Sequence, residues 1–143
     1  MLFTGEFRRS IDEKGRLIVP SSLRELIPGD ELVLSRGVDE CIDLWPRQEW
    51  EAQARDLLAQ SRSRAEVREY TRRLAGKGHH DRIDKQGRIT VPQHLRDFGA
   101  IETEVVIVGM LDHAEIWSPE RYAQQEAKQE ETTLEEQFGR LNI

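Results

Sequence analysis

Apolar and polar residues alternate in two stretches of the chain, and each stretch predicts two strands joined by a tight turn. The stretches are IDEKGRLIVP at residues 11–20 and IDKQGRITVP at residues 83–92, where one strand ends at isoleucine and the next stops at proline. A short helical segment follows, SSLRELI or QHLRDFG. A hairpin then closes each unit, formed by ELVLSRG with CIDLW and by EVVIVGM with AEIW. The order strand, turn, strand, helix, hairpin therefore occurs twice.

The two units form an internal repeat with a constant offset of 72 residues. One unit of roughly 40 residues can hardly bury a core by itself, so the two units are expected to pack against each other. We therefore predict an α+β fold that is mainly β: a small β-barrel, or paired sheets with interleaved halves, made of two pseudo-symmetric β-β-α-β-β repeats. The identical pairs at this offset include Ile11/Ile83, Asp12/Asp84, Gly15/Gly87, Arg16/Arg88, Val19/Val91, Pro20/Pro92, Leu23/Leu95, Arg24/Arg96, Gly37/Gly109 and Trp45/Trp117.

We expect one domain over residues 1–143, because both units are needed to close its core. Its expected parts are a first half at 5–50, linking helices at 51–76, a second half at 77–122, and a C-terminal helix or tail at 118–143. Ser118 is a favourable N-cap for the last helix, and Pro119 suits its first helical position. The Gln/Glu-rich remainder has few apolar residues, which predicts a solvated helix or a frayed tail.

The aromatic residues and the single cysteine are mostly candidates for the core. Trp45 and Trp117 end the closing strands and are predicted to be buried. Trp50 lies on a linking helix and is the candidate for contact between subunits, while Tyr122 fits either role. Cys41 has no partner for an internal disulfide and is expected to be a small buried residue rather than a nucleophile.

Charge is distributed unevenly along the chain. The net charge is −6 and the sequence pI is about 5.3, yet residues 72–98 carry seven basic and three acidic side chains, a net of +4. Residues 1–29 carry a net of +1, whereas residues 101–143 carry ten acidic and three basic side chains, a net of −7. Salt screens charges over roughly 8–10 Å, so a phosphate backbone responds to the local patch more than to the total. The acidic composition therefore does not exclude a nucleic-acid partner.

The chain shows no pattern typical of an enzyme, a metal centre or a membrane protein. The letters His79, His80, Asp81 and Asp84 suggest metal ligands, but no pair has the spacing of a dedicated site, and we expect neither metal nor cofactor. Phosphate-binding glycine loops and nucleophile motifs are missing, so no catalysis and no small-molecule substrate are expected. Without an apolar run of membrane-spanning length or a signal peptide, we expect a soluble cytoplasmic protein with no membrane partner.

The repeated turns carry the most informative polar residues. Asp12 with Gly15, and Asp84 with Gly87, are explained by the turn itself: the aspartate bonds backbone N–H groups, and the glycine supplies a positive φ. The arginine that follows is less easily explained, because an exposed ion pair contributes only about 0–1 kcal/mol. A guanidinium held by an aspartate is, however, oriented to bind a phosphate or a guanine edge through two hydrogen bonds.

These residues carry a resemblance to a known family. With DEKGR at residues 12–16 and DKQGR at residues 84–88, the chain resembles the MraZ family, in which two D-x-x-x-R motifs stand in a swapped-hairpin barrel related to AbrB-type regulators. The resemblance covers essentially the whole chain, including GRLIVP and EIWSPERY. It implies a bacterial, nucleoid-associated transcriptional regulator that assembles into a homo-oligomeric ring. Such a protein binds direct repeats in double-stranded promoter DNA and represses its own operon, the division and cell-wall gene cluster.

The two turns need not contact DNA equally, since Glu13 and Lys14 stand where the second copy has Lys85 and Gln86. The first turn is favoured because two arginines precede it, although strand alternation directs them to opposite faces. The DNA-binding candidates are Arg16, Arg88, Lys14, Lys85, Arg8 and Arg9, and the residues expected to orient the arginines are Asp12, Gly15, Asp84 and Gly87. The alternative is a non-catalytic oligomeric interaction module or antitoxin-like protein whose acidic C-terminal helix captures a protein partner.

Overall fold

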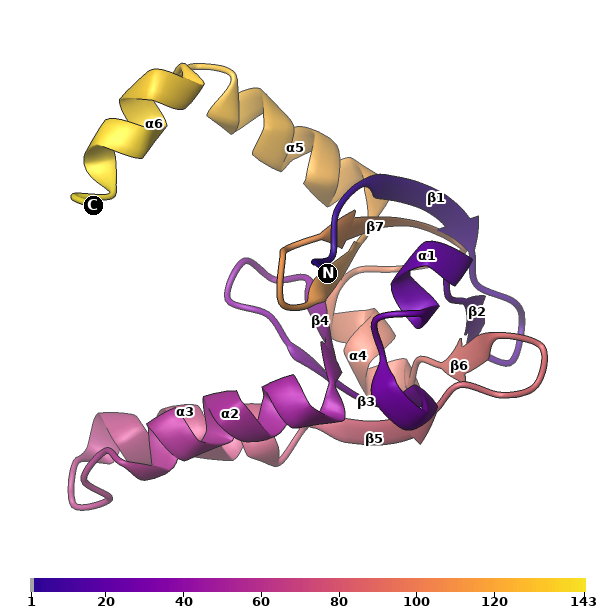
Figure 1. Cartoon of the computed structure of the whole chain (residues 1–143), viewed down its shortest axis with the longest axis horizontal. Coiled ribbons are helices and arrows are strands. Elements are labelled where there is room, and N and C mark those ends of the chain that lie inside the picture. The colour runs from indigo at the N-terminus through magenta and orange to yellow at the C-terminus, as the bar shows by residue number, and fades with distance from the viewer. Residues whose placement is uncertain (1) are drawn as a thin grey trace.

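The strands and helices occur in the repeated order that the sequence predicts. A computed structural model describes residues 2–143; Met1, where the expected domain begins, lies outside the described residues. The strands are β1 (Glu6–Ser10), β2 (Arg16–Ile18), β3 (Glu31–Arg36), β4 (Ile42–Pro46), β5 (His79–Arg82), β6 (Arg88–Thr90), β7 (Glu104–Gly109) and β8 (Ala114–Trp117). The helices are α1 (Ser21–Arg24), α2 (Arg47–Leu58), α3 (Ala65–Ala75), α4 (Gln93–Phe98), α5 (Pro119–Gln129) and α6 (Leu134–Arg140), with a 3-10 turn η1 (Pro28–Asp30). Figure 1 shows their arrangement.

The strands of the two halves are interleaved in shared sheets. A six-stranded antiparallel sheet has the order β1-β7-β8-β4-β3-β5, and β2 pairs with β6 in a separate two-stranded sheet. Thus β1 of the first half pairs with β7 of the second, and β5 of the second half pairs with β3 of the first. The α+β class and the interleaving are confirmed. The pairings among residues 2–143 leave the larger sheet open at β1 and β5, so they do not form a closed barrel.

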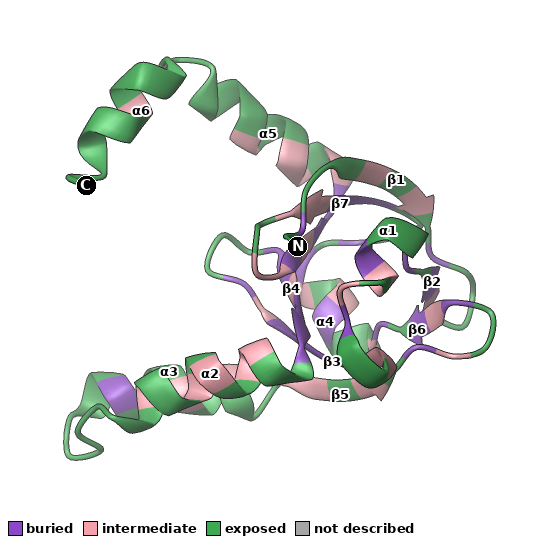
Figure 2. Ribbon diagram, in the orientation of Figure 1, coloured by how far each residue is buried: buried purple, intermediate pink, exposed green. Residues whose placement is uncertain are grey.

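The core lies between the two sheets and the short helices α1 and α4. Alternate residues of β3 and β7 point inward, and the middle residues of β2 and β6 cover them from the other side. Figure 2 shows the buried positions on the strands and the exposed ribbon of α5 and α6. The fully buried side chains include Leu17, Leu23, Leu32, Leu34, Ile42, Leu44, Ile89, Leu95, Ile107 and Ile116.

Several boundaries differ from the sequence prediction. The first strand of each half ends at Ser10 or Arg82, one residue before the predicted isoleucine. Helix α2 begins at Arg47 rather than 51, directly after Pro46. The C-terminal segment forms two helices, not one, because Thr133 starts α6 by accepting a hydrogen bond from the Glu136 N–H at 3.1 Å.

The aromatic residues and the N-cap lie where the sequence places them. Trp117 is buried, and Trp45 is buried with its ring stacked on His113 at 4.1 Å between centroids. The Ser118 hydroxyl accepts a hydrogen bond from the Arg121 N–H at 3.1 Å, which confirms the N-cap of α5. Trp50 is half-buried in an apolar seam between α2 and α3, so its contact with another subunit stays a prediction.

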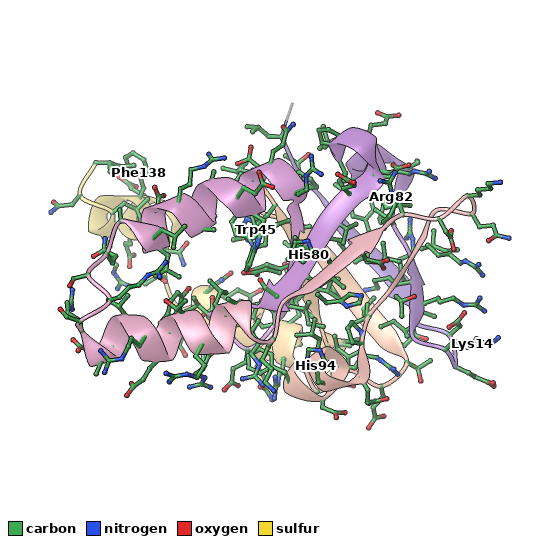
Figure 3. All side chains as sticks on the ribbon, turned by 90° about the horizontal axis from the view of Figure 1, so that it is seen from below. Lys14, Trp45, His80, Arg82, His94 and Phe138 are labelled. Carbon is green, nitrogen blue, oxygen red and sulfur yellow. The ribbon has the colours of Figure 1, made fainter. Side chains whose placement is uncertain are left out.

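Two helical arms leave the body on the side opposite the turns. In Figure 1 the pair α2–α3 and the pair α5–α6 extend to the left, while the loops beside β2 and β6 form the right-hand edge. Figure 3, seen from below, places Lys14 and Phe138 at opposite ends of the molecule. The acidic C-terminal segment therefore lies far from the repeated turns. No helix within residues 2–143 has the length and apolar character needed to cross a membrane.

A cluster of buried and partly buried titratable groups lies where the β3–β4 hairpin meets β8. Ligand atoms of Cys41, Asp43 and Glu115 lie within 4.8 Å of one another, and His113 Nε2 lies 3.8 Å from Asp43 Oδ1. Burial raises the pKa of the Cys41 thiol, and the buried side chain confirms the structural interpretation of this cysteine. Burial also raises the pKa of Asp43 to about 7; His113 opposes this shift, and repulsion from Glu115 adds to it.

Replacing Asp43 by asparagine is expected to remove a pH dependence of folding. The unfolded carboxyl titrates near ~3.9, so between about pH 4 and pH 7 the folded state binds the extra proton and stability falls as pH rises. We expect Asp43→Asn to be more stable than wild type at pH 8, on the order of 1–3 kcal/mol, with a flatter profile below pH 7. Urea denaturation at pH 5 and pH 8 measures this, with exposed Asp39→Asn as the control. Parallel wild-type and variant profiles would contradict it.

Candidate nucleic-acid interface

The turn between β1 and β2 is closed by the carboxylate of Asp12. Its Oδ1 accepts hydrogen bonds from the backbone N–H groups of Lys14 and Arg16, both at 2.9 Å. Its Oδ2 accepts a bond from Arg16 Nε at 2.8 Å. These bonds, the backbone N–H of Arg16 first, lower the pKa of Asp12 from its ordinary value against the opposing effect of desolvation. The carboxylate therefore stays ionised at neutral pH and holds one edge of the guanidinium.

The turn between β5 and β6 has the same geometry. Asp84 Oδ1 accepts bonds from the N–H groups of Gln86 and Arg88 at 2.9 Å, and Oδ2 accepts one from Arg88 Nε at 2.9 Å. The backbone N–H of Arg88 is the main cause that lowers the pKa of Asp84. The two D-x-x-x-R motifs thus form two copies of one local structure, not merely two copies of one sequence.

Gly15 is required by both its backbone and its surroundings. Its φ is +78°, and a Cβ there would lie 2.9 Å from the carbonyl oxygen of Val91. That carbonyl belongs to the other half of the chain, and Val91 N donates a 2.7 Å bond to Gly15 O. Symmetrically, Val19 N donates a 2.8 Å bond to the carbonyl of Gly87, whose φ is +81°. Each turn is therefore fixed by the strand of the opposite half.

Strands β2 and β6 form a two-stranded ribbon with one exposed face. Arg16 pairs with Thr90 and Ile18 with Arg88, so all four side chains point away from the core, while Leu17 and Ile89 are buried. From ordinary strand spacings, the Cα atoms of the two arginines lie about 8 Å apart on one diagonal of the ribbon. Both guanidiniums consequently stand on the same surface, related by a local two-fold axis.

A second pair of arginines, for which the sequence predicted no role, lies beneath the turns. Arg96 of α4 donates from Nε to the Val91 carbonyl at 2.9 Å, and its guanidinium packs beside Gly15 of the opposite half. Arg24 of α1 holds Asp30 with bonds of 3.2 and 3.0 Å and lies beside Gly87. The identity of this pair at the 72-residue offset was the available signal.

The two turns differ in how many guanidinium nitrogens of their arginines donate hydrogen bonds. The two terminal nitrogens of Arg16 have no hydrogen-bond partner among residues 2–143, and only its Nε is engaged. Arg88 also donates from Nη2 to Gln86 Oε1 at 2.7 Å. Lys14 and Lys85 are exposed at the tips of the turns. The first turn therefore offers the more available guanidinium.

The two arginines of β1 lie on opposite faces, as strand alternation predicts. Arg8 is exposed, whereas Arg9 is half-buried with its guanidinium 5.7 Å from the ring centroid of Phe7 and Nη1 bonded to the Arg8 carbonyl. In β5, Asp81 Oδ2 accepts the N–H of Thr90 at 2.8 Å, so this carboxylate supports the ribbon.

Comparison with known proteins identifies the family. The model of the family described as "MraZ protein, putative antitoxin-like" matches residues 2–73 and again residues 75–142. "Transcriptional regulator MraZ" of Natranaerobius thermophilus is 38% identical over 138 residues, which cover 94% of this chain and 96% of that protein. The protein of the same name from Heliobacterium modesticaldum is 40% identical over 127 residues, covering 89% of this chain and 88% of that one. Desulforamulus reducens has a third, 37% identical over 129 residues and 90% of both chains. The chain belongs to the MraZ family.

Proposed function

We propose that this protein is a sequence-specific DNA-binding transcriptional regulator that acts through the exposed face of the β2–β6 ribbon. The observation that carries the proposal is the placement of Arg16 and Arg88 on one surface, each held through Nε by its own aspartate. The relatives are named as transcriptional regulators and not as enzymes, in agreement with the non-enzymatic prediction. We further propose that it represses its own operon, the division and cell-wall gene cluster, in the cytoplasm and at the nucleoid.

A two-stranded ribbon is a shape that the major groove of B-DNA admits. Nε of each arginine is occupied by aspartate, which leaves both terminal nitrogens of Arg16 and Nη1 of Arg88 to bind guanine O6 and N7 or a phosphate. Ile18 is 54% exposed between them and suits a thymine methyl group. Lys14 and Lys85 at the tips, with exposed Arg8, would contact phosphates and add the salt-sensitive part of the affinity.

The distribution of charge supports this orientation. The acidic residues of α5 and α6 lie on arms at the end of the molecule opposite Lys14, so they do not repel DNA bound at the ribbon. Residues 1–143 act in this proposal as one domain of two repeats, because both halves are needed to build the ribbon. No cofactor, membrane or small-molecule substrate takes part in it.

Binding by a single subunit would be weak, and we propose that a ring of subunits binds tandem promoter repeats. Once one subunit is bound, its neighbour meets the next repeat at a high effective concentration, which raises overall affinity by about 10²–10⁴. Neighbouring subunits reach the same side of the duplex when the repeats recur about every 10 base pairs.

Affinity is therefore expected to rise steeply with the number of repeats. We expect fragments of the protein's own upstream region with two and three repeats to bind about 10²-fold or more tightly than a fragment with one. Electrophoretic mobility shifts at fixed fragment length and fixed salt measure this, with scrambled repeats as the control. Equal affinity for one repeat and for three would contradict the ring mechanism. The alternative of an antitoxin-like interaction module, which the exposed helix α6 favours, predicts no dependence on repeats.

A further inference from the structure

Helix α6 presents an apolar stripe that no other part of residues 2–143 covers. Leu134, Phe138 and Leu141 follow one another at intervals of four and three residues, so they share one helix face. Their exposed fractions are 84%, 60% and 60%. A helix with such a face is stabilised mainly by packing against a partner. The Thr133 hydroxyl caps the helix, which adds to its stability.

A groove at the base of α3 has the complementary character. It has a volume of about 300 Å³ and lies between the β3–β4 hairpin, α3 and α4. Its apolar lining includes Leu74 and the ring of Phe98, and half of the Tyr70 side chain is exposed in it. The guanidinium of Arg36 stacks on Phe98 at 4.7 Å, and its buried Nε has no hydrogen-bond partner among residues 2–143.

The charges around the stripe and the groove are opposite. Glu135 and Glu136 flank the stripe, and Glu130 and Glu131 precede it. Arg36, Arg73 and one acidic residue, Glu40, line the groove. Helix α3 and its flanks carry further cations and two acids, which leave this side with a net positive charge: Arg64, Arg68, Arg72, Lys77, Glu66 and Glu69. An apolar face edged by carboxylates matches an apolar groove edged by guanidiniums, and the unpaired Arg36 Nε would gain an acceptor.

From this match we infer that helix α6 of one copy docks in the α3 groove of the next copy. Within one chain the stripe stays exposed and the groove stays open, so neither fills the other. The contact joins two different surfaces, and such a heterologous contact propagates from copy to copy until it closes. The inference rests on the proposed ring and names the surfaces that build it. The stripe lies on the α5–α6 arm, and the groove lies where α3 meets the β3–β4 hairpin and α4, so neither surface includes the β2–β6 ribbon and assembly leaves the ribbon free.

Light scattering coupled to size-exclusion chromatography tests this with the full-length protein. We expect wild type to elute above 33 kDa, twice the chain mass of 16.6 kDa. Leu134→Ser/Phe138→Ser should weaken association at least tenfold and give monomers at low micromolar concentration. Leu111→Ser is the matched control, because Leu111 is 58% exposed on the β7–β8 hairpin and outside both surfaces. A wild-type monomer, or an unchanged assembly mass in the stripe variant, would overturn the inference.

Mixing two defective variants identifies which surfaces meet. Val38→Asp/Arg73→Glu changes two exposed residues of the groove and leaves α6 intact. Each variant alone should be monomeric, while the mixture should give a 1:1 pair near 33 kDa, since it contains one intact stripe and one intact groove. A mixture that stays monomeric would show that the stripe does not bind this groove, and that outcome would refute the docking.

Binding to a single repeat separates this inference from the proposed function. Both variants should bind one repeat with wild-type affinity and lose only the gain from additional repeats. If the stripe variant assembles like wild type while Arg16→Ala abolishes DNA binding, the docking inference is wrong and the DNA-binding proposal stands. If the variants lose assembly and no variant of the ribbon affects DNA binding, the docking stands and the proposed function fails.

Discussion

Arg16→Ala is expected to weaken binding to a single promoter repeat by roughly tenfold to a hundredfold, the equivalent of about 1–3 kcal/mol for one bidentate arginine contact. Arg88→Ala should have a smaller effect, because Arg88 also donates to Gln86. On tandem repeats the loss multiplies over the bound subunits, so the double variant should lose specific binding altogether. Fluorescence anisotropy over a salt series measures both the loss of affinity and the slope of log affinity against log salt concentration.

Folding should hardly change in these variants, since both ion pairs lie at the surface, where water and salt screen them and they contribute little to stability. Arg16→Lys is the informative control. Lysine keeps the positive charge but cannot donate two parallel hydrogen bonds, so the variant should retain non-specific DNA binding and lose its preference for the promoter repeat. Asp12→Asn should resemble it in part, because the guanidinium loses the carboxylate that orients it. Normal promoter recognition by Arg16→Ala/Arg88→Ala would refute the proposed interface.

Gly109→Ala is expected to cause a large loss of stability for so small a change. A Cβ at Gly109 would lie 2.5 Å from Thr4 Cα and 2.6 Å from the Phe3 carbonyl carbon, which are backbone atoms that cannot rotate away. The N-terminal segment is held there by two hydrogen bonds between Phe3 and Leu111, at 2.7 and 2.9 Å. We expect a destabilisation of about 3 kcal/mol and a melting temperature lower by roughly 10 °C.

Gly139→Ala provides the comparison for this prediction. Nothing lies within 4 Å of a Cβ at Gly139, and the residue is inside α6, where alanine favours the helix by about 1 kcal/mol. Its melting temperature should equal or slightly exceed that of wild type. Calorimetry of both variants measures the difference. If Gly109→Ala has the melting temperature of wild type, the close contact between the N-terminal segment and β7 contributes little to stability, and the prediction is wrong.

The repeat made the local structure predictable. Asp, Gly and Arg at fixed spacing specify their own turn, because the aspartate bonds groups only two and four residues away. The offset also indicated that two units pack together and that Trp45 and Trp117 are buried. The T-x-x-E pattern of Thr133 and Glu136 also marks the start of α6, although the segment was predicted only as one C-terminal helix or tail.

Contacts between residues far apart in the sequence were not predictable in the same way. Gly37 and Gly109 are identical at the offset, yet a Cβ at the first would meet the Cys41 sulfur, and at the second the N-terminal backbone. Glycine is therefore required at the two equivalent positions for different steric reasons. The position of Arg24 and Arg96 beneath the turns depends on the interleaving of the halves, which no local pattern specifies. The same holds for the open edges at β1 and β5.

Because both strands of the ribbon belong to one polypeptide, the ribbon can bind DNA with a defined polarity. A ribbon made by two identical chains would offer the same chemistry read forwards or backwards and would suit inverted half-sites. Here Lys14 stands at one end and Gln86 at the other, so the ribbon has a head and a tail. Copies that follow one another in the same sense can then all read one strand with the same polarity, which is what operator sites arranged in tandem demand.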